Sequence, residues 1–573
     1  MRFPRPGPGL AIFAIAWVIF IVSPVRVLTD SRYAALIGPA LWRHGSLALD
    51  PWFPNRSDLP YQVRSVGEHV YPWFPMGGPV VATPFVWLLA RLGLSAVGVD
   101  GAYNERGDMI VQGVLAATAM ALLAVIVFKT ALAVLPTRWS GVMALATVLG
   151  TQIWSNSSRV LWGDTFLVLI MGFAIWRLVL HEKGTRPLSA PLLATALAWG
   201  YFARPTAGIA IVAVTLYLVL HHRRLVLPFI ATGAAWFGLF VVVSQLTFGA
   251  WLPSYYRTTT FGVRAFGGNL LALWFSPSRG QLIFVPVTAF VAYLVVRYRR
   301  SLPHSRLIMP ALVSVAGQVA LVAAFDAWHG GHCYGPRLLT PLVPWLALLG
   351  VLGLSAAREQ RAARLRIELC VGAVLLVCSV LVQARGAWAR ETWNWNVTPN
   401  EFGLHPERVW RWRDAQPVAG LFRAPLPQTV PLFPVGEKLD FGSVSAEPYL
   451  LSGWSGGEGA FRWTDGRAAE LAFGLRAVEP LLLEMQVEAF LPPRRVREQP
   501  VRIDVNGTVL ETVPLNQPGT TTIAVHLPAA ALKRENQLRL ELPKAAFAAP
   551  FGLGSDSRQL GIAVHWLRLR REE

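Results

Sequence analysis

The sequence predicts a polytopic α-helical membrane domain followed by an all-β sandwich domain. Three observations support this fold class. Of 573 residues, 54% are hydrophobic and only 15% are charged, and the mean hydropathy of +0.43 exceeds that of ordinary soluble proteins. Apolar runs long enough to cross a bilayer recur through residues 10–384. Beyond residue 435, short segments of alternating polarity replace them.

The apolar windows predict about eleven to thirteen transmembrane helices, since a bilayer core of ~30 Å needs about 20 residues per helix. The first window, which lacks a small-residue cleavage site, is expected to be a retained helix. Arg204-Pro205 predicts a break inside one long window, at 188–222. The windows are 10–28, 76–95, 110–134, 139–155, 163–181, 188–222, 225–247, 282–298, 306–326, 337–356 and 366–384.

The net charge of +19 follows a membrane pattern rather than a nucleic-acid one. Lys and Arg cluster in short connectors between apolar runs, which the positive-inside rule assigns to the cytoplasm. No basic module with interleaved aromatic residues is present, so no nucleic-acid partner is expected. The basic connectors are 181–186, 221–224, 297–300 and 358–366. The segments predicted to be non-cytoplasmic are 30–75, 248–281, 327–336 and everything after about 385.

Three parts are expected along the chain. Residues 1–384 form the membrane domain, with 30–75 as its first external loop, and residues 385–435 form a linker rich in Trp and Pro. Residues 436–573 are expected to form a sandwich of roughly 140 residues. Asn506-Gly507 between two strand-like runs predicts a type I′ hairpin. The expected strand segments are 469–478, 481–490, 501–515, 520–527, 537–542 and 561–570.

The first external loop begins with Asp30, which we interpret as the main catalytic candidate. A carboxylate at the membrane boundary can accept the proton of an attacking hydroxyl when the two groups lie within about 3 Å. The alternative is that Asp30 caps the next helical segment. Tyr33, Asp50, Asp58 and Tyr71 of the same loop are candidate cavity residues, although an aromatic belt also explains Tyr71.

Two later external loops each carry an arginine at the membrane boundary. Arg279 lies in FSPSRGQLIFVP and Arg337 in DAWHGGHCYGPRLLTPLVP. A planar guanidinium group binds phosphate in a bidentate manner. Both are therefore candidate phosphate ligands, as is Arg204 in the predicted helix break. Snorkelling to lipid headgroups is the alternative for Arg279 and Arg337.

Further polar residues interrupt the apolar sequence. Asp164 is a candidate cavity residue because ionisable groups within membrane segments usually have functions. Asp326, His329 and His332 are candidates for hydrogen bonding to a substrate or for holding a divalent cation. Gly330-Gly331 indicates a tight loop and favours hydrogen bonding. The three cysteines match no disulfide framework and no metal-site spacing.

The order of these motifs resembles the bacterial GT-C glycosyltransferases, which include protein O-mannosyltransferases and the lipid A aminoarabinose transferase. The resemblance covers about residues 10–360. It rests on TDSRYAAL, GEHVYPWFPMGGPVVATPF, ARPTAG, FSPSRGQLIFVP and WHGGHCYGPRLLTPLVPWL. It implies a bacterial inner-membrane enzyme that uses a polyprenyl-phosphate sugar donor and inverts the anomeric carbon. It also implies that Asp30 is the acid-base residue and that Arg279 and Arg337 meet the lipid phosphate.

Ser31 departs from the family pattern, since many relatives have a second acidic residue after the first-loop Asp. This leaves metal dependence open, with Mg²⁺ or Mn²⁺ as the possible cofactor and no metal ligand assigned. The expected partners are the lipid bilayer, the donor lipid and a glycan, lipid or protein acceptor. Two other functions stay open: a transporter or flippase for lipid-linked saccharides, and a non-catalytic scaffold that displays the β-domain. A transporter is expected to show repeated halves, and we find none in the sequence.

Overall fold

The structure is a computed structural model. It describes residues 7–572 except 259, 263, 361–364, 398–401, 404, 425, 428, 548–555 and 557; part of the connector 358–366 therefore lies outside the described residues. The chain forms two compact units. The helical unit comprises Met1–Gly330 and Gly335–Ala387, and the β unit comprises Gly331–Tyr334 and Trp388–Glu573.

The predicted fold class is confirmed: a helical unit suited to a membrane and a separate β unit. Among the described residues, six helices are long and apolar enough to cross a membrane. They are Glu105–Ala131 (α4), Gly163–Glu182 (α6), Arg223–Phe248 (α9), Ser305–Ala324 (which contains α14, Ile308–Ala324), Arg337–Glu359 (which contains α15, Val343–Glu359) and Leu365–Trp388 (α16). Together with its composition, these helices identify the chain as an integral membrane protein.

Other helices are shorter than the predicted windows. The window 282–298, for example, divides at Pro286 into α12 and α13, because proline removes a backbone donor. The shorter helices are α1 (Pro8–Val22), α2 (Ile37–His44), α3 (Gly77–Arg91), α5 (Thr137–Leu149), α7 (Ala190–Ala203), α8 (Ala207–His221), α10 (Ser254–Arg257), α11 (Phe266–Phe275), α12 (Gln281–Phe284), α13 (Val287–Arg297) and α17 (Arg390–Asn394).

The break predicted at Arg204-Pro205 is confirmed. Helix α7 ends at Ala203, Arg204 has extended backbone angles, and α8 begins at Ala207. Pro205 explains the break, because the residue before a proline is restricted to extended conformations. The break places Arg204 at the end of α7 instead of inside a helix.

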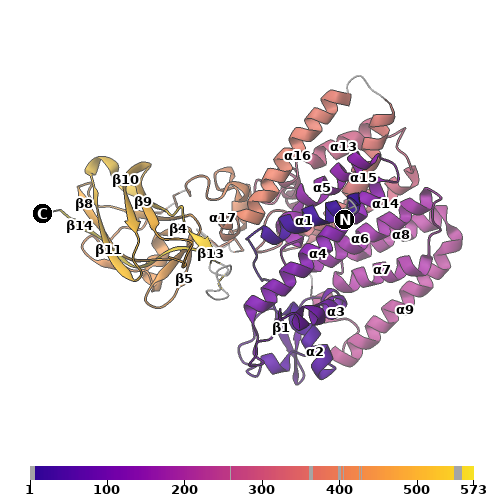
Figure 1. Ribbon diagram of the computed structural model, residues 1–573, viewed down its shortest axis with the longest axis horizontal. Helices are drawn as coiled ribbons and strands as arrows, with labels where there is room; N and C mark the ends of the chain where they lie inside the picture. Colours follow the sequence, from indigo (N-terminus) through magenta and orange to yellow (C-terminus); the bar gives the residue numbers. More distant parts are fainter. Residues whose placement is uncertain are drawn as a thin grey trace, which may run out of the picture. The chain divides into compact units, whose positions relative to one another are not determined.

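The first external loop has its own secondary structure. After α1 it forms α2 and then an antiparallel hairpin of β1 (Val63–Val66) and β2 (His69–Pro72), with Gly67 at positive φ in the turn. Figure 1 shows β1 beside α2 and α3. The Arg159 side chain stabilises the end of α1 and the residues after it, since it donates to the carbonyls of Phe20 (2.6 Å) and Val25 (3.0 Å).

The β unit is a two-sheet sandwich, as predicted (Figure 1). One sheet has the order β10-β9-β12-β7-β4, and the other contains β11-β8-β14-β6-β5 with β3 and β13 paired to β14. Along β8 buried and half-buried residues alternate, which is the pattern of a sheet with one face on the core. Asn506 and Gly507 both have positive φ between β9 and β10, as a type I′ turn requires.

The strands are β3 (Lys438–Asp440), β4 (Leu450–Ser452), β5 (Trp454–Gly457), β6 (Arg462–Asp465), β7 (Ala468–Gly474), β8 (Leu481–Ala489), β9 (Gln499–Val505), β10 (Thr508–Leu515), β11 (Thr520–Leu527), β12 (Glu535–Glu541), β13 (Ala546–Phe547) and β14 (Gln559–Arg571). Each of the six predicted strand segments overlaps one or two of them.

Candidate functional site

A cavity of about 530 Å³ lies in the helical unit, between the first external loop, the α7–α8 break and the segment before α15. Most of its lining is apolar, and a few charged groups project into it from separate parts of the chain. These include Asp30, Arg204 and Arg337. Ligand sites in proteins commonly combine an apolar wall with a few convergent polar groups. The cavity is therefore the candidate functional site.

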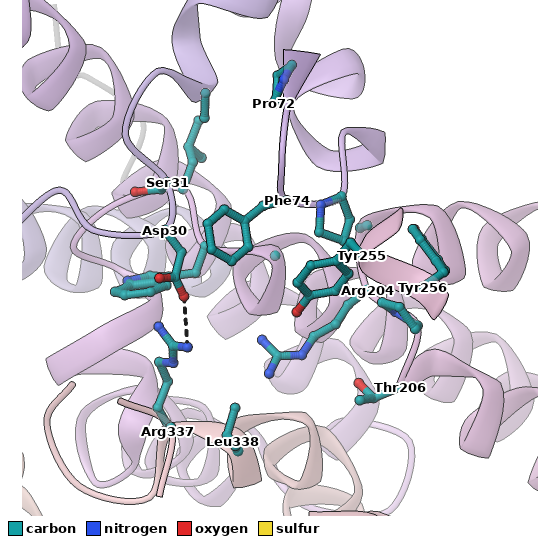
Figure 2. A pocket seen from close by; sticks show the side chains of 18 of the residues that line it. Asp30, Ser31, Pro72, Phe74, Arg204, Thr206, Tyr255, Tyr256, Arg337 and Leu338 are labelled. Atoms are coloured by element: carbon teal, nitrogen blue, oxygen red, sulfur yellow. Dashed lines mark hydrogen bonds and ion pairs between the residues drawn. The ribbon is translucent and has the colours of Figure 1, made fainter. Parts of the chain in front are cut away.

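Asp30 and Arg337 form an ion pair on the cavity wall, although 307 positions separate them in sequence. Arg337 Nη2 donates to Asp30 Oδ2 at 3.0 Å, and Figure 2 shows the two side chains pointing toward one another. The Arg337 guanidinium lies over the Trp162 ring, 4.0 Å from its centroid. The side chain of Asp30 is 29% exposed and that of Arg337 only 9%. The carboxylate is thus the more accessible member of the pair.

Tyr61 contacts the other oxygen of the same carboxylate. Its hydroxyl donates to Asp30 Oδ1 at 3.4 Å. Desolvation of the hydroxyl and the neighbouring charge of Asp30 raise the pKa of Tyr61 to about 12. Tyr61 therefore remains a neutral hydrogen-bond donor to Asp30 at physiological pH.

Asp30 does not cap a helix. Neither the short 3₁₀ turn Ala34–Leu36 nor α2 receives a side-chain hydrogen bond at its N-terminus. The capping explanation considered from the sequence is therefore wrong, and the carboxylate is left facing the cavity.

Arg204, at the break between α7 and α8, also lines the cavity. It forms an ion pair with Asp164, whose side chain is 1% exposed compared with 13% for Arg204. Figure 2 shows the Arg204 guanidinium directed into the cavity, with the Tyr255 hydroxyl beside it. Burial raises the pKa of Tyr255, so this phenol also stays neutral. Asp164 lies behind Arg204 and does not line the cavity.

A second cavity, of about 520 Å³, adjoins the first and is mostly apolar, although Arg64 also lines it. The two cavities share the lining residues Pro72, Phe74, Pro75, Tyr255 and Tyr256. The rings of Phe74 and Tyr255 pack with their centroids 5.6 Å apart. Helix α9 supplies Leu239 and Val243 to the lining, and both are also exposed on the surface of this apolar helix. The second cavity therefore lies next to the lipid-facing surface of α9.

Arg279 lies away from both cavities. Its side chain is fully buried, with Nε donating to the His329 carbonyl (2.9 Å) and Nη1 to the Ser278 carbonyl (2.8 Å). The bond to His329 joins two loops. The structure thus does not bring Arg279 to Arg204 and Arg337.

The other candidates from the loop that carries Arg337 are outside the cavity lining. Phe325 and Ala327 line the cavity but Asp326 between them does not, and neither do His329 and His332. His332 belongs to the β unit. Within the described residues, no group of three or more His, Cys, Asp or Glu side chains is arranged to hold a metal ion.

Four first-loop candidates lie outside the main cavity. Asp50 accepts hydrogen bonds from His69 Nδ1 and from the Val70 N–H, both at 2.7 Å, and so fixes the hairpin to the chain before it. Tyr33 packs against Phe53 and Tyr103, and Asp58 is exposed. Tyr71 lines the apolar cavity instead.

Sequence reasoning missed Tyr61, Trp162 and Tyr255. In the sequence each is an aromatic residue near a membrane boundary. An aromatic belt explains such residues equally well. Their contacts with the charged groups depend on segments far apart in the chain. No local spacing predicts such contacts.

No protein-family model matches the chain, and no curated protein matches it in sequence. Two crystal structures of an oligosaccharyltransferase from Archaeoglobus fulgidus are similar in fold, one in the apo form and one tethered by a disulfide bond to an acceptor peptide with an NVT sequon. Identity is 11% in each, with TM-scores of 0.42 and 0.43 respectively. The alignments cover 77% and 74% of this chain and 63% and 61% of the other, so the chain spans about three fifths of that protein's length.

Proposed function

We propose that this chain is a GT-C-type membrane glycosyltransferase, which moves a sugar from a polyprenyl-phosphate donor to an acceptor hydroxyl. One observation carries the proposal: Asp30, Arg337 and Arg204 converge on one cavity, and an apolar cavity adjoins it. A lipid-linked donor needs this combination. It has an apolar tail, an anionic phosphate and a sugar that an acceptor must reach.

The apolar cavity suits the isoprenoid tail of the donor. Most residues of its walls are aromatic or aliphatic, and the surface of α9 beside it gives a path from the bilayer. A tail in this cavity would bring the phosphate to the shared wall at Phe74 and Tyr255, close to Arg204. The guanidinium group of Arg204 can then bind the phosphate by charge-assisted hydrogen bonds.

The reaction places the proton acceptor and the leaving group on opposite sides of the sugar. Asp30 takes the proton of the acceptor hydroxyl as its oxygen forms a bond to the anomeric carbon. The bond from that carbon to the phosphate oxygen breaks, and polyprenyl phosphate departs with the electron pair. Configuration at the carbon inverts. Because Arg204 lines the same cavity and is paired with Asp164 instead of Asp30, we assign it to the leaving phosphate.

We assign Arg337 two roles in this reaction, one toward Asp30 and one toward the donor phosphate. Its ion pair with Asp30 holds the carboxylate in place. A planar guanidinium group can also contact a phosphate along a second edge. We therefore assign Arg337 to the orientation of Asp30 and to charge neutralisation of the donor.

We place the enzyme in a bacterial inner membrane, with its cavity and β unit outside the cytoplasm. The basic connectors between apolar helices support this orientation. The acceptor is then a glycan, lipid or protein of the cell envelope. A reporter fused after residue 573 that is active only in the cytoplasm would contradict this topology.

Asp30→Asn tests the proposed base. The amide keeps the size of the side chain but lacks the basic carboxylate, and loss of a general base typically costs about 10²- to 10⁴-fold in rate. We expect turnover to fall by that much while the donor still binds. Transfer is measured by mass spectrometry with a panel of polyprenyl-phosphate sugars, and donor binding is measured on the same purified variant.

Asp58→Asn is the matched control. It removes an exposed carboxylate of the same loop that does not line the cavity. Its turnover should stay near that of the parent protein. Near-normal transfer by Asp30→Asn would exclude Asp30 as the base.

A further inference from the structure

Gln112 of α4 connects two backbone segments at the edge of the proposed site. Its side chain is fully buried, and its Nε2 donates to the Ser31 carbonyl at 2.8 Å. Its Oε1 accepts from the Leu161 N–H at 3.1 Å. One amide side chain thus bonds to backbone groups that are 130 positions apart in sequence.

One of these segments carries Asp30, and the other carries Trp162, which contacts Arg337. Ser31 directly follows Asp30, and Leu161 directly precedes Trp162, over whose ring the Arg337 guanidinium lies. A shift of either segment would therefore change how the carboxylate and the guanidinium group meet. Gln112 itself lies outside the cavity lining and touches neither charged group.

Asp108, one turn earlier on α4, forms hydrogen bonds both to Gln112 and to the first loop. Its Oδ1 accepts from Gln112 Nε2 at 2.8 Å, and its Oδ2 accepts from the Tyr33 N–H (3.0 Å) and the Tyr103 hydroxyl (2.9 Å). The loop after Asp30 is thus held at both Ser31 and Tyr33. A buried and satisfied network of this kind rigidifies the groups attached to it.

We infer that Gln112 is a positioning residue, which sets the geometry of Asp30 relative to Arg337 by fixing Ser31 and Leu161 to α4. The inference rests on the proposed function, because it assigns a role in the reaction of that same cavity. Catalytic groups need support from surrounding hydrogen bonds to stay in a productive arrangement. A displacement of about 1 Å can lower a rate about 100-fold.

Gln112→Met tests this role, since methionine approximates the length of glutamine but makes neither hydrogen bond. We expect turnover to fall about 10- to 100-fold and the donor KM to change less, because Gln112 supports the segments at Asp30 and Trp162 and makes no hydrogen bond to Arg204. Thermal unfolding of the variant is recorded alongside to measure the structural cost.

Gln383→Met is the matched control. Gln383 is also fully buried and also links two segments, since it accepts from Ser155 Oγ (2.6 Å) and donates to the Phe284 carbonyl (2.8 Å). It lines neither cavity. Its loss should lower the unfolding temperature by a similar amount and leave turnover within about twofold.

The two variants separate positioning from stability. If Gln112→Met loses stability as Gln383→Met does but keeps its turnover, the positioning role is overturned. A cryo-EM structure of Gln112→Met provides a readout that needs no donor: we expect the Asp30 Oδ2 to Arg337 Nη2 distance to depart from 3.0 Å. An unchanged distance would overturn the inference even if the proposed transfer reaction failed in the parent protein.

Discussion

Two ion pairs at the cavity differ in how exposed their carboxylates are. Asp30 pairs with Arg337 and Asp164 with Arg204, so each guanidinium group is matched by one carboxylate. Buried charges are retained in proteins when they are paired in this way. Asp30 is 29% exposed and Asp164 only 1%. Asp30 is thus able to meet a substrate, whereas Asp164 holds Arg204 in place.

The two arginines should differ in kinetic effect. Arg204→Lys keeps a cation but loses the planar fork that binds phosphate. We therefore expect a donor KM raised about tenfold, near the lower end of the roughly 1.5–3 kcal/mol of a hydrogen bond to a charged group. Arg337→Lys should mainly lower turnover, because Asp30 loses its oriented partner. Initial rates over a range of donor concentrations give KM and turnover for each variant.

Arg91→Lys serves as the control for this comparison. Arg91 is exposed at the end of α3, stacks on Trp87 and lines neither cavity. Equal kinetic changes in all three variants would show a general charge effect. Unchanged donor KM in Arg204→Lys and Arg204→Ala would remove Arg204 from the phosphate site.

At the residue scale, sequence reasoning located the charged groups better than their partners. Asp30, Arg204 and Arg337 were predictable because each is an ionisable residue at the end of an apolar run, where charge is costly without a function. Trp162 and Gln112 carry no such signal. Arg279 has the same signal as Arg337, yet it binds backbone carbonyls. Only tertiary packing distinguishes the two.

At the element scale, the break at Arg204-Pro205 and the strands were predictable, whereas the break at Pro286 and the helix lengths were not. Proline explains the break at Arg204-Pro205, because it restricts the backbone of the residue before it. Alternation of polar and apolar residues explains the strands. Helix α11 (Phe266–Phe275) was missed because its ten residues are too few for a window that assumes a full span. Short helices of this kind are stabilised by packing, as α11 packs on α14.

Gly77 allows α3 to approach the end of α7. A Cβ atom at this position would lie 2.6 Å from the Phe202 carbonyl oxygen and 2.7 Å from the Ala203 nitrogen. Both are backbone atoms, so α3 must move. Gly77→Ala should therefore destabilise the helical unit by about 1–3 kcal/mol, as overpacked substitutions do, and weaken donor binding through Arg204, which follows Ala203.

Gly233→Ala on α9 is the control, because nothing lies within 4 Å of a Cβ atom at that position. Thermal unfolding in detergent and donor binding are measured on both variants. Equal unfolding temperatures for the two would contradict close packing of α3 on α7.

At the scale of the whole molecule, the two units differ in how their surfaces meet the solvent. Helix α9 exposes large apolar side chains along its length, as expected of a surface in contact with lipid. The β unit instead has a closed apolar core between its sheets and alternating strands. The β unit should therefore fold in water without the helical unit, and the remaining issue is where it begins.

The predicted boundary at residue 436 cuts into this core. Phe433 is 6% exposed and packs on Tyr449 and Phe473. The segment before residue 436 also adds hydrogen bonds, since the Ala424 N–H donates to the buried Glu470 carboxylate (2.7 Å) and Gly474 exchanges two bonds with Pro431 and Phe433 (2.7 and 2.9 Å). A fragment that starts at residue 436 lacks all of these.

Two soluble fragments, 388–573 and 436–573, should therefore differ in stability. Loss of a buried aromatic side chain alone typically costs about 3–5 kcal/mol, so 388–573 should unfold cooperatively at a clearly higher temperature or urea concentration than 436–573. Circular dichroism during urea unfolding measures this, and Phe433→Ala in the longer fragment should reproduce most of the difference. Equal midpoints would show that residues 388–435 contribute nothing to the sandwich, and aggregation of both fragments would contradict an independent β unit.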